Sequence, residues 1–349
     1  MNLKNIYVFC PNDIVTGGPD ALHQIVYYSN KLGLNAKIVY YAFSKKHQFF
    51  IPEAYKNYVS DFVVEKEFID SKDNVVILPE HAIDKLKYLK KSKVFVWWLS
   101  VDNNINRSSF FWKIFFFATL PARVVKNWDY YKKRFGEAIV KTLQAKAYSF
   151  KKENDNIEHI CASHYAYDFV SKRSSKEVSL CIEPISKFFL EKFETHKDDL
   201  SSCKRKDVVL YNPKKNGEFV KKLVDYAPDL NFEPLVGLTQ EQLIDKYKSA
   251  KVYVDFGPFP GAERIPKEAV LFGCSVITGR RGASNFYGDV PIPDEYKFGD
   301  YQNQIEQIVQ KIRELLVDYN SKNKDFNEYR KTVLSLEENF MKSLRENIL

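Results

Sequence analysis

The sequence predicts an α/β protein made of two doubly wound, Rossmann-like domains. Short apolar runs alternate with helical patterns from the N-terminus, and the same alternation begins again after residues 185–206, a polar and charged stretch that we expect to be the interdomain linker. Continuous apolar strands separated by helices are typical of parallel sheets covered on both faces. A chain of 349 residues is also too long for one ordinary hydrophobic core.

The first half contains a series of apolar runs that predict strands. Between the first two, Leu22, Ile25, Val26, Ser29 and Leu32 follow helical spacing, and Gly33 predicts the end of that helix. The strands are expected at Asn5–Cys10, Ala36–Tyr41, Val75–Pro79, Lys93–Leu99, Glu158–Ala162 and Val178–Ile182.

The second half repeats this rhythm, with strands expected at 207–212, 231–237, 251–256 and 274–279. Thr239 and Gln242 have the spacing of a capping box and predict a helix start. We expect an N-terminal domain at 1–184, a second domain at 185–320, and a C-terminal helix at 321–349 that packs back on the first. Because ligands of such sheets bind beyond the carboxyl ends of the strands, we expect the domains to face each other across a cleft.

Composition and charge narrow the class of partner. A hydrophobic content of 45% and a charged content of 28% are those of a soluble globular protein. The net charge of +8 favours anionic partners such as nucleotides, nucleic acid or acidic lipid, although a lysine-rich composition accounts for it equally well.

Cysteine use and hydropathy predict a protein of a reducing compartment. No two cysteines have the spacing of a zinc site, and four of the five lie in apolar runs, where Cys packs as a small hydrophobe. The N-terminal segment is too short and too soon interrupted for a signal peptide, and no apolar run reaches the length of a membrane span. The cysteines are Cys10, Cys161, Cys181, Cys203 and Cys274.

Residues 107–134 combine aromatic, apolar and basic side chains without strand alternation. The apolar core Phe110–Leu120 is too short to span a bilayer and contains Lys113. Aromatic residues flanked by basic ones suit the interface of an anionic membrane, whereas a helix buried on the sheet with a solvated basic end is the structural alternative. The flanking basic residues are Arg107, Arg123, Lys126, Lys132, Lys133 and Arg134.

The stretch GPFPGAERIPKEAVLFGCSVITG at 257–279 places unusual charge in a Gly/Pro loop directly after a buried strand. Glu263 and Arg264 precede Pro266, which fits the first turn of a helix. A purely structural loop needs turn residues, but it does not need this charge. The structural alternative is that Glu263 stabilises the N-terminus of the helix and pairs with Lys267, four residues later.

The order of parts resembles a GT-B glycosyltransferase, most closely the family 4 enzymes that use nucleotide sugars. The resemblance covers most of the chain and is carried by a Gly-Gly loop before the first helix and by CASHYAYDFV, from Cys161, at the end of the first domain. Looser matches are Glu183-Pro184-Ile185-Ser186 and the strand-end loop YNPKKNG. The donor-site pattern is matched by Gly261, Glu268-Ala269, Gly273 and Val276-Ile277.

The resemblance implies a transferase that moves a sugar from a nucleotide-sugar donor to a glycan or glycolipid in surface polysaccharide biosynthesis, with retention of configuration. The C-terminal domain would hold the donor and the N-terminal domain the acceptor. One departure is that Pro260 stands where the family has its first Glu. No DxD pair is present to hold a diphosphate through a metal, so we expect no essential metal and no cofactor besides the donor substrate.

The expected donor-site residues lie at strand ends of the second domain and in one loop of the first. Glu268 is expected to accept ribose hydroxyls, Arg264 to bind phosphate, and Glu263 to orient Arg264 or bind the sugar. Lys214 or Lys215 would neutralise the leaving phosphate, with no choice made between them. Gly17 and Gly18 would let the backbone approach a phosphate or a sugar closely. Gly261 belongs to the donor loop. Arg280, Arg281 and Gly282 are further candidates for contact with the donor or the acceptor.

For the N-terminal domain the candidates are Glu80, His81 and Asp102, which follow two predicted strands. Asp102 or Glu80 would act as base if the reaction inverts configuration. If it retains configuration, His81 would only hold a sugar hydroxyl, and a lone His at a strand end is often structural.

Three alternatives remain from the sequence. One is a nucleotide-sugar epimerase of the same fold, and another is a GT-B-like sugar- or nucleotide-binding protein that has lost transfer. A nucleic-acid binder rests on charge alone, because no nucleic-acid module is present, and we expect no nucleic-acid partner. The expected location is the cytoplasm, peripheral to the inner face of the plasma membrane.

Overall fold

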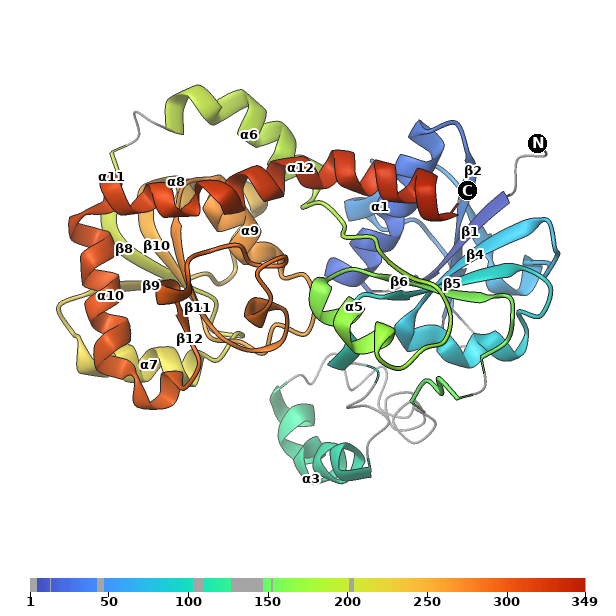
Figure 1. Cartoon of the computed structure of the whole chain (residues 1–349), viewed down its shortest axis with the longest axis horizontal. Helices are drawn as coiled ribbons and strands as arrows, with labels where there is room; N and C mark the ends of the chain where they lie inside the picture. The colour runs from blue at the N-terminus through green and yellow to red at the C-terminus, as the bar shows by residue number, and fades with distance from the viewer. Residues whose placement is uncertain are drawn as a thin grey trace. The chain divides into compact units, whose positions relative to one another are not determined.

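The structure is a computed structural model that describes residues 5–12, 14–42, 47–102, 104, 110–126, 147–151, 153–200 and 204–348. The chain forms two compact units, each built around its own parallel sheet with flanking helices (Figure 1). This confirms the predicted fold class of two Rossmann-like α/β units. The first unit contains residues 1–162, 166–181 and 341–349, and the second contains 163–165 and 182–340.

The first unit contains a seven-stranded sheet in the order β3-β2-β1-β4-β5-β6-β7. All its strand pairs are parallel, and its central strands are buried along most of their length. The strands are β1 Asn5–Pro11, β2 Asn35–Tyr41, β3 Phe62–Val64, β4 Asn74–Pro79, β5 Lys93–Trp98, β6 Ile157–Cys161 and β7 Val178–Leu180.

The second unit contains a five-stranded parallel sheet in the order β12-β11-β10-β8-β9. Helices α8 and α9 pack on β10, and α10 packs on β10 and β8 together with α7, so the sheet is enclosed by helices (Figure 1). The strands are β8 Lys206–Tyr211, β9 Asn231–Pro234, β10 Ala250–Asp255, β11 Ser275–Gly279 and β12 Lys297–Phe298.

The helices follow the strands much as their apolar periodicity predicts, and the predicted capping box at Thr239 and Gln242 is present. In the described part of the chain the α-helices are α1 Gly17–Lys31, α3 Phe110–Lys126, α5 His164–Ser171, α6 Lys187–Leu200, α7 Gly217–Tyr226, α8 Gln240–Ser249, α9 Arg264–Leu271, α10 Ile305–Val317, α11 Tyr319–Lys322 and α12 Asn327–Ser343. The first unit includes the end of α12, where Ser343 Oγ donates to the carbonyl of Leu180 at 2.6 Å.

The stretch 185–206 is not the simple linker that its polarity suggested, because it contains helix α6. Phe189 is buried, and Phe188, Leu190 and Phe193 pack partly buried against the core of the second unit. A few aromatic side chains at helical spacing therefore outweigh the charged residues between them.

Helix α3 carries most of the described part of the aromatic, basic segment. Leu120 is buried, whereas Ile114, Phe117 and Val125 are exposed, so the helix is not buried all round. Residues 107–109 and 127–134, with Arg107, Lys132, Lys133 and Arg134, lie outside the described residues. Among the described residues, no helix is both long enough and apolar enough to cross a membrane.

Candidate functional site

Three loops at the carboxyl edge of the second sheet contact one another. After β8, Asn216 donates from Nδ2 to the carbonyl of Phe256, which follows β10, at 3.2 Å. The amide of Ala283, after β11, donates to the carbonyl of Phe259 at 2.8 Å. Gly282 has φ +52 and a Cβ there would lie 2.1 Å from the Phe259 oxygen, so only glycine allows this close approach.

Two predicted residues from different loops meet in an ion pair. Lys215 Nζ lies 2.7 Å from Glu263 Oε2, and the two side chains are only 22% and 16% exposed. Lys214 is exposed, and its amide donates to Asn212 Oδ1 at 3.0 Å. The structure thus distinguishes the two lysines, because Lys215 faces the loop after β10.

The other predicted donor-site residues lie on the same loop and on α9. Gly261 is buried, and Arg264 is the half-buried first residue of the helix. Glu268 is buried in the first turns of α9, where its Oε2 accepts from the hydroxyl of Tyr247 at 3.3 Å. From the candidate Arg281, Nη1 donates to the Tyr301 hydroxyl at 3.0 Å.

Asp255, the last residue of β10, is a site residue that the sequence analysis did not select. It is 1% exposed, and its carboxylate accepts from the Gly257 amide and from the Tyr253 hydroxyl, both at 2.9 Å. Burial raises the pKa of Asp255 to about 6, and the Glu263 charge adds to this while Lys215 opposes it. The only signal in the sequence is a carboxylate inside an apolar run.

Beside this cluster, α9 buries a lysine near two further carboxylates. Lys267 is 5% exposed, and burial lowers the pKa of its ammonium against the opposing charges of Glu183 and Asp289. Asp289 accepts from the amides of His164 and Tyr165 at 2.7 and 3.0 Å, at the N-terminus of α5. Burial raises the pKa of Asp289 despite these bonds.

In the first unit, the predicted residues gather at the carboxyl edge of its sheet. Gly17 and Gly18 open α1, and a Cβ on Gly18 would lie 3.8 Å from Leu99 Cδ1, beyond β5. Glu80, after β4, is 2% exposed and accepts the Leu99 amide at 3.2 Å. His81 Nε2 lies 2.9 Å from the hydroxyl of the buried Tyr41, which ends β2.

Asp102 lies half-buried just beyond β5, three residues after Leu99. At the same edge, the buried Asn12 contacts two residues that follow β2: its Oδ1 lies 2.7 Å from His47 Nε2 and accepts the Phe50 amide at 3.2 Å. Tyr41, Asn12 and His47 are therefore polar groups of this edge that the sequence analysis missed. Their pairing depends on contacts between distant segments, and no local motif marks it.

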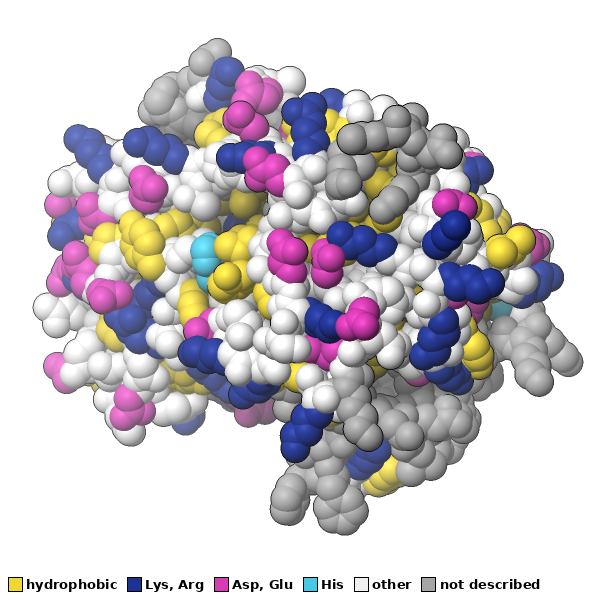
Figure 2. Space-filling model, turned by 45° about the vertical axis from the view of Figure 1, so that its right-hand side comes forward, with side chains coloured by type: hydrophobic (Ala, Val, Ile, Leu, Met, Phe, Trp, Pro, Cys, Tyr) yellow, Lys and Arg dark blue, Asp and Glu magenta, His cyan; other side chains and the backbone are white. Residues whose placement is uncertain are grey.

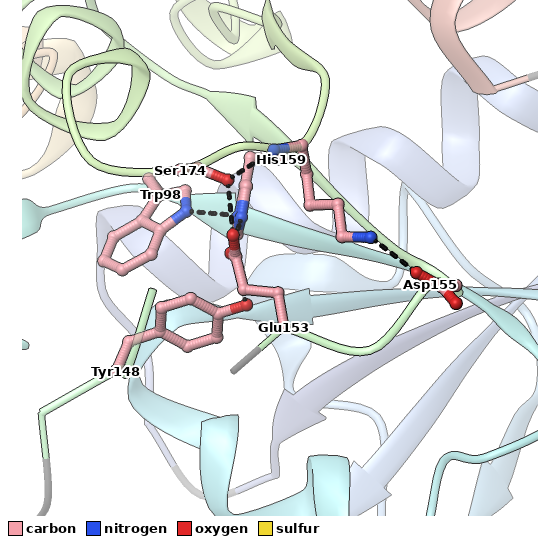
Figure 3. Close-up of polar contacts among 7 residues, drawn as sticks. Trp98, Tyr148, Glu153, Asp155, His159 and Ser174 are labelled. Atoms are coloured by element: carbon pink, nitrogen blue, oxygen red, sulfur yellow. Dashed lines mark hydrogen bonds and ion pairs between the residues drawn. The ribbon is translucent and has the colours of Figure 1, made fainter. Parts of the chain in front are cut away.

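A second polar network, also missed, lies inside the first unit (Figure 3). Trp98 Nε1 donates to His159 Nδ1 at 3.0 Å, and His159 Nε2 lies 2.6 Å from Glu153 Oε1. Tyr148 and Ser174 donate to the same carboxylate at 2.9 and 2.7 Å. Because indole is only a donor, Nδ1 accepts and the imidazole donates its Nε2–H, which is the neutral tautomer. Burial accordingly lowers the pKa of His159. The network attaches Tyr148 and Glu153 to β5 and β6, and its His159 and Glu153 side chains are buried, so neither is an exposed base.

No part of the described chain brings three or more His, Cys, Asp or Glu side chains into a group that could hold a metal ion. The ionisable groups described at the second unit's carboxyl edge include Asp255, Glu263, Lys215 and Arg281, and α9 adds further charges. This arrangement can bind an anion or a polyhydroxylated ligand through paired charges and loop amides.

Comparisons with known proteins place this architecture. No family model and no curated protein sequence matches the chain. Solved structures match along the whole length, at TM-scores of 0.59 for sucrose-phosphate synthase from Thermosynechococcus elongatus, 0.56 for the lipopolysaccharide outer core galactosyltransferase WaaB, and 0.55 for the pneumococcal O-GlcNAc transferase GtfA with UDP and GlcNAc. The chain has the GT-B glycosyltransferase fold.

In sequence, sucrose-phosphate synthase, WaaB and GtfA are 12%, 11% and 9% identical to this GT-B protein, respectively. They cover 98%, 99% and 100% of this chain and 98%, 99% and 99% of the matched chains. This confirms the GT-B resemblance that the motifs carried, while membership of family 4 within that fold stays a prediction.

The environment of Asp255 predicts a pH dependence of stability. The folded protein binds this proton more tightly than the unfolded chain, because its pKa rises from 3.8 to about 6. The free energy of unfolding of the second unit should therefore fall by up to about 3 kcal/mol as pH rises from below about 4 to above about 6. Asp255→Asn should remove this slope, and Asn in place of the exposed Asp245 should keep it.

Urea unfolding followed by circular dichroism measures this slope. The tryptophans, at positions 97, 98, 112 and 128, all belong to the first unit, so their fluorescence separates its unfolding from that of the second. An unchanged slope in Asp255→Asn would show that this carboxyl does not titrate as its burial requires.

Proposed function

We propose that this GT-B protein is a glycosyltransferase that moves a sugar from a nucleotide-sugar donor to a glycan or glycolipid acceptor, with retention of configuration. The pathway is surface polysaccharide or lipopolysaccharide biosynthesis at the cytoplasmic face of the membrane. The observation that carries this proposal is the meeting of Lys215, Glu263 and α9 at the carboxyl edge of the second sheet, which is where doubly wound sheets bind ligands.

The second unit supplies the groups that a nucleotide diphosphate requires. Lys215 and Arg264 offer positive charge to the two phosphates, and the first amides of α9 add their dipoles. Glu268, held by Tyr247, offers carboxylate oxygens to ribose hydroxyls. GtfA, a structural neighbour, was solved with UDP and GlcNAc, which supports this class of donor.

In the transfer step, the acceptor oxygen forms a bond to the anomeric carbon while the bond from that carbon to the diphosphate oxygen breaks. The hydroxyl proton passes to the leaving diphosphate, whose charge Lys215 and Arg264 compensate. His81, Asp102 and the Gly17-Gly18 turn are proposed to hold the acceptor or the donor sugar from the first unit. No metal is assigned a role in this step.

One specific observation supports an alternative function in which the protein binds its ligand but catalyses no reaction. Pro260 occupies the position at which family 4 enzymes have their first Glu, so a sugar- or nucleotide-binding protein of the same fold is the second candidate. An epimerase of this fold would convert the donor sugar without an acceptor. A neighbouring α-glucosyltransferase was solved with DNA, and salt-sensitive DNA binding by this chain would contradict our assignment of a glycan or lipid acceptor.

The donor proposal predicts that one nucleotide class stabilises the protein. We expect UDP-, GDP-, dTDP- or CMP-sugars of one base to raise Tm and to undergo slow hydrolysis. Lys215→Met and Glu268→Gln should weaken this binding about tenfold or more, because each removes a contact to a charged or hydroxylated group. Lys214→Met, the neighbouring exposed lysine, is the matched control and should change binding little.

Thermal shift and donor hydrolysis, measured together, decide between the candidates. Binding without hydrolysis or transfer would favour the binding protein, and conversion of the donor sugar would favour the epimerase. No shift with any nucleotide sugar in a folded sample would contradict the donor site itself.

We further propose that the segment around α3 binds an anionic membrane surface. The sequence of helix α3 contains no acidic residue, and its basic residues are Lys113, Arg123 and Lys126. The same helix exposes the apolar side chains of Ile114, Phe117 and Val125. Residues 107–134 contain seven basic residues and one acidic residue, and so contribute +6 to the net charge of +8. On the face of the molecule drawn in Figure 2, by contrast, acidic and basic side chains of the described residues are interspersed.

Vesicle flotation tests this surface. Wild type should float with phosphatidylglycerol vesicles and not with phosphatidylcholine alone, and Phe117→Ser with Val125→Ser should reduce flotation several-fold. Exposed Val317 and Val236 of the second unit, changed to Ser, provide a matched loss of apolar surface that should have no effect. Equal flotation of both double variants would contradict a role for α3.

A further inference from the structure

The stem of Lys215 packs closely over Gly257. A Cβ built on Gly257 would come within 2.9 Å of Lys215 Cδ and 3.1 Å of Lys215 Cβ. The absence of a side chain at position 257 therefore lets the lysine stem lie directly across the end of β10. The ammonium reaches Glu263 from this position, with an Nζ–Oε2 distance of 2.7 Å.

Glu263 directs its charge at this lysine and not at the helix that it precedes. It is the N-cap residue of α9, a position from which a short polar side chain normally accepts an amide of the first turn. No such side-chain capping bond forms here. The carboxylate instead pairs with Lys215, in a setting where both side chains are largely removed from solvent.

The positive charge of Lys215 is thus compensated by a carboxylate of the protein itself. Asp255 lies beneath the same glycine, with Oδ1 3.0 Å from the position of the Gly257 Cβ, and is 1% exposed. Two carboxylates therefore lie close to one lysine. Because charges interact more strongly at partly buried sites than in water, a phosphate approaching Lys215 is also repelled by Glu263.

We propose that Glu263 is an internal counter-ion that holds Lys215 in the donor-free protein, and that the diphosphate of the donor displaces it. This inference rests on the proposed function, because it concerns the same site. The contact lowers the affinity for every diphosphate ligand and keeps Lys215 ordered while the site is empty. Release of Glu263 on binding then makes its carboxylate available to the sugar or to Arg264.

The proposal has a consequence opposite to that of an ordinary binding residue. Removing the charge of Glu263 should strengthen binding of a nucleotide diphosphate, whereas a carboxylate that binds the sugar would weaken it when changed. The gain should depend on Lys215 and vanish when this lysine is absent. A double-mutant cycle therefore isolates the contact.

The test uses calorimetric titration of the full chain with UDP-glucose, GDP-mannose, dTDP-glucose and ADP-glucose. Glu263→Gln should bind the probe that wild type prefers about tenfold more tightly, since a nearby like charge has been removed. Lys215→Met should bind it more weakly, and Glu263→Gln should bring no gain when combined with Lys215→Met.

Asp229→Asn is the matched control. It also removes one carboxylate charge from an ion pair, with Arg313, but it lies before the start of β9 and so at the amino edge of the sheet. Its affinity for the probe should match that of wild type, and unfolding curves of all variants should confirm the folded state.

The outcomes separate this proposal from the function on which it rests. Binding by wild type that Glu263→Gln leaves unchanged or weakens would overturn the counter-ion and leave the donor site standing. A gain that persists without Lys215 would overturn it as well, because the charge effect would then act elsewhere. No binding of any probe by wild type or by Glu263→Gln, both folded, would overturn the donor site and this proposal together.

Discussion

The structure depends first on the parallel direction of every strand pair in both sheets. Parallel strands with helical crossovers bring all their following loops to one edge, whatever the distance in sequence. In the second unit this constraint brings Lys215 beside Glu263, and it lets the loop after β11 close on the loop after β10. In the first unit it brings the ends of β2, β4 and β5 together through Tyr41, His81 and Glu80.

The two units use this edge differently. The described groups of the first unit's edge are largely hydrogen-bonded among themselves, as in the pairs of Asn12 with His47 and of Tyr41 with His81. The second unit collects charge, with the buried Asp255 below the Lys215–Glu263 pair. On the counter-ion proposal, an anionic ligand that binds Lys215 replaces the existing contact of this lysine with Glu263.

Much of the fold was predictable, because buried parallel strands are continuous apolar runs and their helices carry apolar periodicity. The error at α6 has a simple origin, since four of the seven helix residues after Phe193 are charged, and this polarity concealed the buried Phe189. Strand-end position and family resemblance selected Glu263, Arg264, Glu268 and either Lys214 or Lys215. The structure places Lys215 beside Glu263 at the carboxyl edge of the second sheet, with Arg264 and Glu268 on α9. Their roles with a donor stay predictions.

The remaining residues could not be predicted from the sequence, because their roles depend on hydrogen bonds that only the folded structure shows. Asp255 looked like an interruption of an apolar strand, and only the bonds from Tyr253 and Gly257 show why a carboxylate is tolerated there. Likewise, Trp98 and His159 are 61 residues apart, and no periodicity in either segment announces their hydrogen bond. The choice between Lys214 and Lys215 needed the direction of a side chain, which spacing does not give.

The proposed function depends most on donor binding at the carboxyl edge of the second unit. Hydrogen exchange measured by mass spectrometry, with and without the nucleotide sugar that stabilises the protein most, tests it directly. The account predicts slower exchange at residues 212–217 and 256–268, with little change at the amino edge around Asp229. Protection confined to the first unit, or absent from both loops at saturating ligand, would contradict it.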